Sequence, residues 1–172
     1  DEELMIHGDI GQIEQVVLNL LTNASEATQN QAETGCIKIR TGVSLLGKHE
    51  FSDYYFCENG APGKFVYFEV EDNGSGMNED CLSKMFDPFF TTKFTGRGLG
   101  LAGVSGIIRG HHGGLQVNSV LNQGSCFRVI LPQSLETTAE SDDEGSGELQ
   151  IPVDSGSILV IDDDKAVCNV VD

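Results

Sequence analysis

Between Asp9 and Gln31, apolar residues recur at the spacing of a helix that buries one face. These residues are Ile10, Ile13, Val17, Leu20, Leu21, Ala24 and Ala27. At about 100° per residue, a neighbouring stripe of the same helix collects the polar residues Gln12, Asn19, Asn23 and Glu26. The pattern predicts a helix that packs against a core and presents amides and a carboxylate beside the packed face.

The chain after this helix changes to the shorter period of β-strands. Residues 36–43 alternate apolar with charged side chains, and residues 65–70 are dense in strand-forming types. The intervening residues 44–64 contain Asn-Gly and Pro-Gly pairs, which predict an extended hairpin or loop. After the strand over 65–70 we expect a short helix over 78–85 and a Gly- and Thr-rich segment over 88–100. A helix over 101–109, capped by Gly110, follows, and then strands over 115–119 and 126–131.

Composition narrows the class of partner. The chain has 172 residues and a formal net charge of −17, with a sequence pI near 4.3. Its length allows one full domain and a remnant of a second. A polyanion would be repelled by so acidic a surface, so we expect no nucleic-acid partner.

The sequence also bears on the compartment. No apolar run approaches the roughly 20 residues of a membrane span, and no signal peptide opens the chain. We therefore expect a cytoplasmic fragment that is not membrane-bound, which leaves open a membrane anchor elsewhere in the parent protein. The five cysteines include no CxxC pair, so reduced thiols are favoured over disulfides or a zinc site.

Three short motifs carry candidate chemistry. The first is the pair Asn19 and Asn23, one helical turn apart. The carbonyl oxygen of Asn23 is a suitable ligand for a hard cation such as Mg²⁺ beside a phosphate chain. The alternative is the ordinary solvated face of an amphipathic helix.

The second motif runs from Asp72 to Gly76, directly after an apolar strand. A carboxylate at a strand end can accept a hydrogen bond from an exocyclic amine, which distinguishes adenine from guanine. Gly74 and Gly76 lack a Cβ, so the backbone can turn with positive φ and a flat base can approach closely. The alternative is a simple Asn-Gly turn.

The third motif, Gly96 to Leu101, opens a helix with alternating glycines. Free backbone N–H groups at a helix N-terminus favour an anion, so this segment predicts a phosphate cradle flanked by Lys93 and Arg97. It lacks the βαβ context of a dinucleotide site and the Gly-Lys-Ser/Thr ending of a P-loop.

The order of these motifs, with Phe86-Asp87-Pro88-Phe89-Phe90-Thr91-Thr92-Lys93 between the last two, resembles the N, G1, F and G2 boxes of histidine kinases. The resemblance runs from about Glu3 to Pro132 and is greatest to kinases of the nitrogen-regulation and oxygen-sensing type. It implies the Bergerat fold, a two-layer α/β sandwich with a mixed, mainly antiparallel sheet and helices on one face.

The resemblance also implies roles for individual residues. Asn19, Asn23 and Lys93 would be catalytic, with Asn23 as the Mg²⁺ ligand. Asp72 would bind the adenine amine. Phe89 and Phe90, together with Phe86, would anchor a mobile lid over 88–100. The expected ATP-binding residues are Asp72, Gly74, Gly76, Phe86, Thr92, Arg97, Gly98, Leu99, Gly100 and Leu101.

One departure separates this chain from the gyrase, Hsp90 and mismatch-repair ATPases of the same fold. Those proteins place a water-activating Glu where this chain has Asn19. An amide cannot take a proton from water, so we expect transfer of the ATP γ-phosphoryl group to a histidine rather than efficient hydrolysis. The alternatives are a Bergerat-fold ATPase and a degenerate nucleotide-binding scaffold.

The acceptor histidine itself is expected elsewhere. None of His7, His49, His111 and His112 has the acidic neighbour and helical context of the family's acceptor, so we interpret all four as structural. The expected partners are the parent protein's own histidine-bearing dimerisation domain, in a homodimer, and a receiver domain or response regulator.

The chain divides into three parts by composition. Residues 1–133 are the expected ATP-binding catalytic domain, and residues 134–156 are an acidic linker. Residues 157–172 resemble the first strand of a receiver domain, followed by Asp162 and Asp163 of its acidic pair. The alternative for these last residues is the end of an acidic linker. With the receiver reading, the parent is a hybrid kinase.

Overall fold

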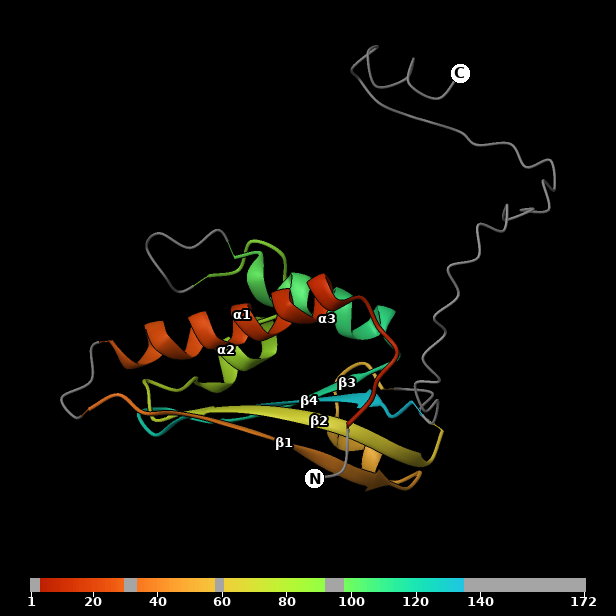
Figure 1. Cartoon of the computed structure of the whole chain (residues 1–172). Coiled ribbons are helices and arrows are strands. Elements are labelled where there is room, and N and C mark those ends of the chain that lie inside the picture. The colour runs from red at the N-terminus through yellow and green to blue at the C-terminus, as the bar shows by residue number, and fades with distance from the viewer. Residues whose placement is uncertain (1–3, 30–33, 58–60, 92–97, 135–172) are drawn as a thin grey trace, which may run out of the picture. The chain divides into compact units, whose positions relative to one another are not determined.

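The computed structural model describes residues 4–29, 34–57, 61–91 and 98–134. Three helices cover one face of a four-stranded sheet (Figure 1): α1 (Ile10–Thr28), α2 (Glu79–Lys84) and α3 (Gly100–Gly110). The strands are β1 (Ile37–Leu46), β2 (Gly63–Asp72), β3 (Gly114–Val120) and β4 (Gly124–Pro132). The predicted α/β class with helices on one face is confirmed.

The sheet has the strand order β1-β2-β4-β3. All three strand pairings are antiparallel, so the parallel pairing that a mixed sheet would add is absent from the described residues. Asp72, at the end of β2, lies opposite Ile37 of β1 and Ser125 of β4. The carboxylate singled out in the sequence therefore lies at the end of a central strand.

Helix α1 forms where the apolar pattern predicts it. Its N-cap is Asp9, whose side chain accepts the backbone N–H of Gln12 at 2.8 Å, which satisfies one of the free donors of the first turn. Its buried residues, Val16, Leu20 and Ala24, lie in one core cluster with Val70 of β2 and residues of α3, β3 and β4. Helix α1 ends at Thr28, and the last two residues of the predicted span, 30 and 31, lie outside the described residues.

The strands of the first hairpin are longer than predicted. β1 and β2 pair along their whole length, from Ile37 opposite Asp72 to Leu46 opposite Gly63. The predicted loop over 44–64 therefore reduces to 47–62, which carries a 3-10 turn, η1 (Glu50–Asp53). The last strand, β4, likewise extends beyond the predicted 126–131 and includes Pro132.

The predicted cap of the last helix was wrong. Gly110 is the final residue of α3, and the left-handed residue of the turn is His112, with φ of 54°. The N–H of Gly113 bonds to the Ile108 carbonyl at 2.9 Å and that of His112 to the Arg109 carbonyl at 3.0 Å, the pattern of a Schellman motif. A Cβ on Gly113 would overlap the Ile130 carbonyl, so the glycine is needed there for close approach to β4.

A second, smaller core lies on the other face of the sheet. It contains Leu46, Phe51, Cys57, Phe65 and Ile130, with Tyr54 and Tyr67 packed against it. The 47–62 connection supplies several of these side chains and so covers part of the face that carries no helix (Figure 1).

The two ends of the described domain meet. Ile6 forms a β-bridge with Gln133, and the Ser134 N–H donates to the Met5 carbonyl at 2.9 Å. The proposed receiver start over 157–172, and the linker apart from Ser134, lie outside the described residues, so the domain division stays a prediction. No helix within the described residues is long and apolar enough to cross a membrane.

Candidate functional site

Asp72 is the buried acid of the candidate site. It is 6% exposed, and its Oδ1 accepts the backbone N–H of Gly74 at 2.8 Å. Burial raises the pKa of the Asp72 carboxyl above its ordinary range, although hydrogen bonds from the backbone N–H groups of Gly74 and Ser125 act in the opposite direction. Such a carboxylate can also accept a hydrogen bond from a ligand amine at the strand end.

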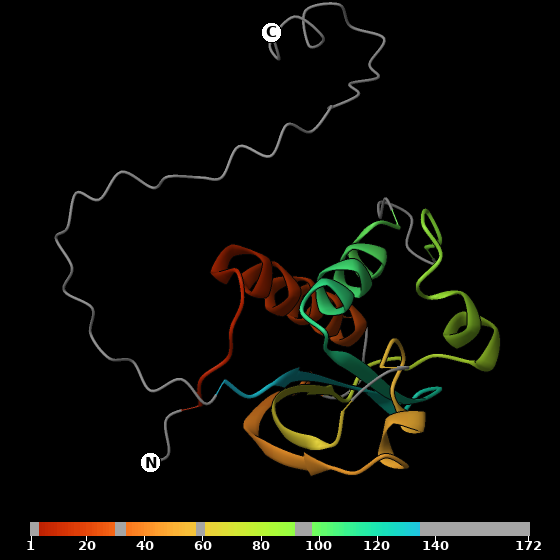
Figure 2. The ribbon, with the colours of Figure 1, turned by 90° about the vertical axis from the view of Figure 1, so that its right-hand side faces the viewer.

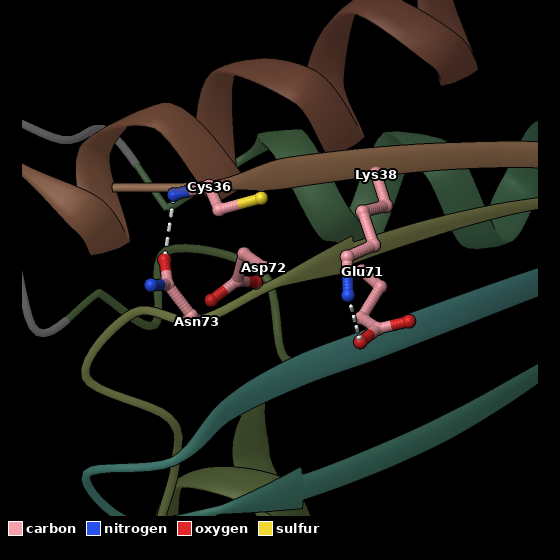
Figure 3. A pocket seen from close by; sticks show the side chains of 5 residues that line it. All are labelled: Cys36, Lys38, Glu71, Asp72 and Asn73. Atoms are coloured by element: carbon pink, nitrogen blue, oxygen red, sulfur yellow. Dashed lines mark hydrogen bonds and ion pairs between the residues drawn. The ribbon is translucent and has the colours of Figure 1, made fainter. Parts of the chain in front are cut away.

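A small pocket beside Asp72 is lined by Cys36, Lys38, Glu71 and Asn73 (Figure 3). The Oδ1 of Asn73 accepts the Cys36 backbone N–H at 2.7 Å, and its Nδ2 donates to the Thr34 carbonyl at 3.1 Å. Asn73 therefore fastens the start of β1 to the end of β2, a role that the turn motif alone did not indicate.

The turn after Asp72 lies against the last turns of α1. The Ser75 N–H donates to the Ala27 carbonyl at 3.0 Å, and a Cβ on Gly74 would lie 2.6 Å from the same carbonyl oxygen. Gly74 is therefore required by contact with the chain's own helix. Because Asn23 lies one turn before Ala27, the polar stripe of α1 runs beside this turn.

Gly76 occupies a position that only glycine fits. Its φ is 60°, and a Cβ would overlap the Val120 carbonyl at the end of β3. The next residue, Met77, donates its N–H to the Ser119 Oγ at 2.8 Å. The 72–77 turn is thus held by the β3–β4 hairpin on one side and by α1 on the other.

Two serines near Asp72 were missed by sequence reasoning. Ser125 is buried opposite Asp72, and its Oγ lies 2.9 Å from the Ser119 Oγ. The signal available was the sequence Gly124-Ser125-Cys126-Phe127, which overlaps the start of the strand predicted over 126–131. The hydroxyls supply donors and acceptors at the same strand end as the carboxylate.

The N-terminus of α3 is open to an anion. Its N-cap residue, Leu99, makes no side-chain cap hydrogen bond, and no acidic residue lies in the first turn. Gly98, with φ of 66°, is so close to Phe89 that a Cβ would overlap the Phe89 backbone, and the Phe89 N–H donates to the Gly98 carbonyl at 2.9 Å. The first N–H groups of a helix have no partner within the helix and carry partial positive charge.

The fold brings the first and third motifs together. A Cβ on Gly100 would lie 3.5 Å from the Asn19 Oδ1, although the two residues are far apart in sequence. Asn19 and Asn23 are both half-buried. The amide stripe of α1 therefore borders the open N-terminus of α3.

The remaining predicted site residues divide into three groups. Phe86 and Leu101 are half-buried and pack against the main core, so part of their role is structural. Leu99 is exposed. Thr92, Lys93 and Arg97 lie outside the described residues, as do the other residues of 92–97 in the predicted 88–100 segment.

The oxygen donors near the start of α3 suit a cation that binds together with a phosphate ligand. Within residues 4–29, 34–57, 61–91 and 98–134, no three His, Cys, Asp or Glu side chains group as a metal site. The oxygen donor that the structure places beside the start of α3 is the Asn19 amide, which is neutral and hard, and Asn23 lies one turn further along α1. The two amides fit Mg²⁺, which typically takes few protein ligands and completes its coordination with water and substrate phosphates.

His111 has a structural role, in line with its interpretation from sequence. Its Nε2 accepts the Asp9 backbone N–H at 3.1 Å, so its Nδ1, 2.8 Å from the Ile107 carbonyl, is the donor. The imidazole joins the end of α3 to the start of α1. A phosphoacceptor would need a free ring nitrogen.

Fold and site together define an ATP-binding module of the α/β sandwich class. The family model for histidine kinase-, DNA gyrase B- and HSP90-like ATPases matches residues 8–135, and the chain belongs to this family. Within it, the similar proteins are sensor kinases, so the chain is an ATP-binding catalytic domain of the histidine-kinase type.

Two relatives illustrate the similarity. The chain is 34% identical over 174 residues to the sensor kinase CckA of Brucella abortus (strain 2308), which covers 94% of this chain and 17% of CckA. It is 40% identical over 129 residues to the sensory histidine kinase/phosphatase NtrB of Rhodobacter capsulatus. The aligned region covers 73% of this chain and 33% of NtrB. The chain thus spans a third or less of these two relatives.

Solved structures agree with the fold. The nucleotide-free catalytic domain of histidine kinase ThkA superposes with a TM-score of 0.56 at 34% identity, covering 77% of this chain and 74% of that one. Full-length ShkA, solved in complex with AMPPNP, gives a TM-score of 0.54 at 27% identity, over 77% of this chain and 24% of that one.

Proposed function

We propose that this domain binds Mg-ATP and donates its γ-phosphoryl group to a histidine on a dimerisation domain of the parent protein. The observation that carries the proposal is the position of Asn19, one turn before Asn23 on α1, beside the N-terminus of α3, which has no side-chain cap. Phosphate oxygens at that helix end would lie beside two neutral oxygen donors.

Adenine would bind at the other end of the site. The buried Asp72 carboxylate would accept the exocyclic amine of adenine, an interaction that guanine, with a carbonyl at that position, could not make. Support comes from ShkA, a similar chain that was solved with AMPPNP.

Mg²⁺ would be held by Asn23, with Asn19 beside it, and by the phosphates. When bound, the ion would neutralise charge on the phosphate oxygens. The part of this chain is to hold the triphosphate at the start of α3 and to orient it through the amides of α1. Lys93 and Arg97 are further proposed phosphate contacts.

Asn19 favours transfer over hydrolysis. It lies beside Gly100, where a base would have to act on water near the γ-phosphate, and an amide cannot accept that proton. No feature of the site favours the hydrolase or scaffold alternatives over transfer.

Beyond this domain, we propose a homodimeric parent kinase whose histidine passes the phosphoryl group to a receiver aspartate. The alignment with CckA covers 94% of the chain and so extends past residue 135, where the family model ends. The similarity to CckA therefore continues beyond the catalytic domain. The apolar run before Asp162 and Asp163 favours a hybrid kinase in which residues 157–172 begin a receiver.

Calorimetry with ATP and GTP in the presence of Mg²⁺ tests the nucleotide. We expect binding of ATP and at least about tenfold weaker binding of GTP, because one hydrogen bond to a charged group is lost. Equal affinity for the two nucleotides would contradict the role of Asp72.

Radiolabelled transfer tests the reaction. With γ-labelled ATP and the histidine-bearing hairpin of the parent protein added in trans, we expect label on the hairpin and little free phosphate. Asn23→Ala should reduce transfer by at least about tenfold, in the range seen when support of a bound metal is removed. Gln12→Ala, exposed on the same stripe, is the matched control and should leave transfer unchanged. Rapid phosphate release without an acceptor would instead assign the domain to the hydrolase branch.

A further inference from the structure

The 47–62 connection does more than close the β1–β2 hairpin. Tyr55 pairs with Leu115 on the free edge of β3, through its N–H to the Leu115 carbonyl at 2.8 Å and the reverse bond at 3.1 Å. Residues before and after this point lie in the small core on one face of the sheet, whereas Phe56 packs against the main core on the helical face. The connection therefore passes around the edge of β3 (Figure 2).

Phe56 has an unusual backbone conformation for a bulky residue. Its φ is 72°, in the left-handed region that favours glycine, and such a residue persists only where its surroundings require it. The Arg109 guanidinium of α3 lies 4.2 Å from the centre of the Phe56 ring, a distance at which a cation and an aromatic face attract each other. The strained turn thus directs an aromatic ring to one place.

That place is the side chain of Phe86, which follows α2. The Phe56 and Phe86 ring centroids are 5.0 Å apart and those of Tyr55 and Phe86 are 5.2 Å apart, both in edge-to-face geometry. Helix α2 has no fully buried side chain, and Leu82, Met85 and Phe86 are the residues that pack this stretch against the main core.

The same stretch leads directly to the phosphate end of the site. Phe89, three residues after Phe86, donates its N–H to the Gly98 carbonyl at 2.9 Å, and Gly98 precedes the first turn of α3. A displacement of Phe86 would therefore move the backbone partner of Gly98. We propose that Tyr55 and Phe56 are positioning residues of the nucleotide site, which hold Phe86 and, through Phe89, set the placement of Gly98 at the start of α3.

The effect on nucleotide binding rests on the proposed function, but the positioning itself can be measured without nucleotide. We expect Phe56→Gly to accept the left-handed backbone while removing the ring. Amide hydrogen exchange at Phe89 in the nucleotide-free chain should then rise by at least about tenfold, because its bond to Gly98 opens more often. Phe56→Tyr, which keeps the ring, should restore the wild-type exchange rate.

ATP affinity is the second readout. The apparent Kd equals the intrinsic Kd divided by the fraction of molecules whose site is correctly placed. Phe56→Gly lowers that fraction and should therefore raise the Kd for Mg-ATP by about fivefold or more. The control is Phe51→Leu in the same connection, which disturbs the small core where Phe51 meets Phe65 at 5.6 Å. It should lower the unfolding midpoint and leave both the Phe89 exchange rate and the Kd unchanged.

The outcomes separate the two proposals. Unchanged Phe89 exchange in a folded Phe56→Gly variant overturns the positioning role, whatever the ATP affinity. Faster exchange with an unchanged Kd also overturns it, because the displaced segment then has no effect on the site. If wild type binds no ATP, the proposed function fails and the nucleotide part of this inference fails with it. If Phe56→Gly does not fold, Phe56→Asn takes its place, because Asn tolerates positive φ.

Discussion

At the scale of single residues, the site is built around the buried acid Asp72. Asp72 is stabilised by backbone N–H groups, and burial raises its pKa. A group whose pKa is higher in the folded state stabilises the fold only while it is protonated. That contribution is complete below the unfolded pKa of about 4 and is lost as pH rises through the folded pKa. At neutral pH the charged Asp72 therefore destabilises the nucleotide-free domain.

We predict opposite effects of Asp72→Asn on stability and on binding. The variant should unfold at a higher urea concentration than wild type at pH 7.5, because its neutral amide can still accept the Gly74 N–H. The difference should shrink in acid, below pH about 4, where Asp72 is protonated in both states. ATP affinity should fall by roughly tenfold to a hundredfold, the loss of one hydrogen bond to a charged group. A variant that binds ATP normally would contradict the assignment.

Two glycines of the same domain should respond oppositely to alanine. Gly76→Ala should lower the free energy of unfolding by about 2 kcal/mol or more, since it combines strained φ with an overlap on the Val120 carbonyl. Gly103→Ala, in the interior of α3, adds a Cβ that meets no other part of the domain within 4 Å, so it should raise the free energy of unfolding by roughly 0.5–1 kcal/mol. Urea unfolding of both variants measures the contrast, and equal effects would show that Gly76 is not constrained as described.

At the scale of elements, a charge network joins β1, β2 and β4 on the face opposite the helices. Glu69 is 7% exposed and accepts hydrogen bonds from Arg40 Nε at 2.7 Å and Arg128 Nε at 2.8 Å. Arg40 also pairs with the more exposed Glu71, and the Arg128 guanidinium lies 4.3 Å from the Tyr67 ring centre. The strands are thus linked by side chains as well as by their backbone ladder.

Glu69 and Glu71 should differ in their contribution to the free energy of unfolding. Glu69→Ala should cost about 2 kcal/mol or more, because two charge-assisted hydrogen bonds at a buried acceptor are lost. Glu71→Ala should cost less than about 1 kcal/mol, as expected for a partly exposed ion pair. The neighbouring Arg40 lowers the pKa of Glu71, so the small contribution of Glu71 is present above its unfolded pKa and is lost as pH falls through the folded pKa. Denaturant titrations at neutral and acidic pH compare the two, and similar costs would contradict the burial argument.

At the scale of the whole molecule, the catalytic domain closes on itself near residue 134. The Gln133 N–H donates to the Lys64 carbonyl at 3.1 Å, and Ser134 bonds to Met5. Eleven acidic residues and a single lysine follow Ser134. These residues therefore supply much of the negative charge of the chain.

Two truncations test this boundary. A chain ending at Ser134 should keep its unfolding midpoint and its ATP affinity, because the contacts that join the two ends are retained and self-repulsion falls. A chain ending at Leu131 loses those contacts and should unfold about 4–8 °C lower for each kcal/mol lost. Calorimetric scans of both fragments decide the matter, and a large loss in the longer fragment would refute the domain division.

The sequence by itself determined the elements, the order of the motifs and the family. The helical period of 9–31 and the acid at the end of an apolar strand depend on residues within a few positions of one another. Local patterns of this kind can be predicted without a structure. They sufficed to single out Asn19, Asn23 and Asp72.

Only the tertiary structure decided what each of these residues meets. That Asn19 borders Gly100, that Gly74 is required by Ala27, and that Ser125 lies opposite Asp72 follow from contacts between distant segments. The cap of α3 was misassigned for the same reason, because its glycine is used at 113 for approach to β4 and the left-handed position falls to His112. Likewise, the passage of the 47–62 connection around β3 depends on how the sheet presents its free edge. No local pattern records such contacts, since their energy comes from packing that exists only once the chain is folded.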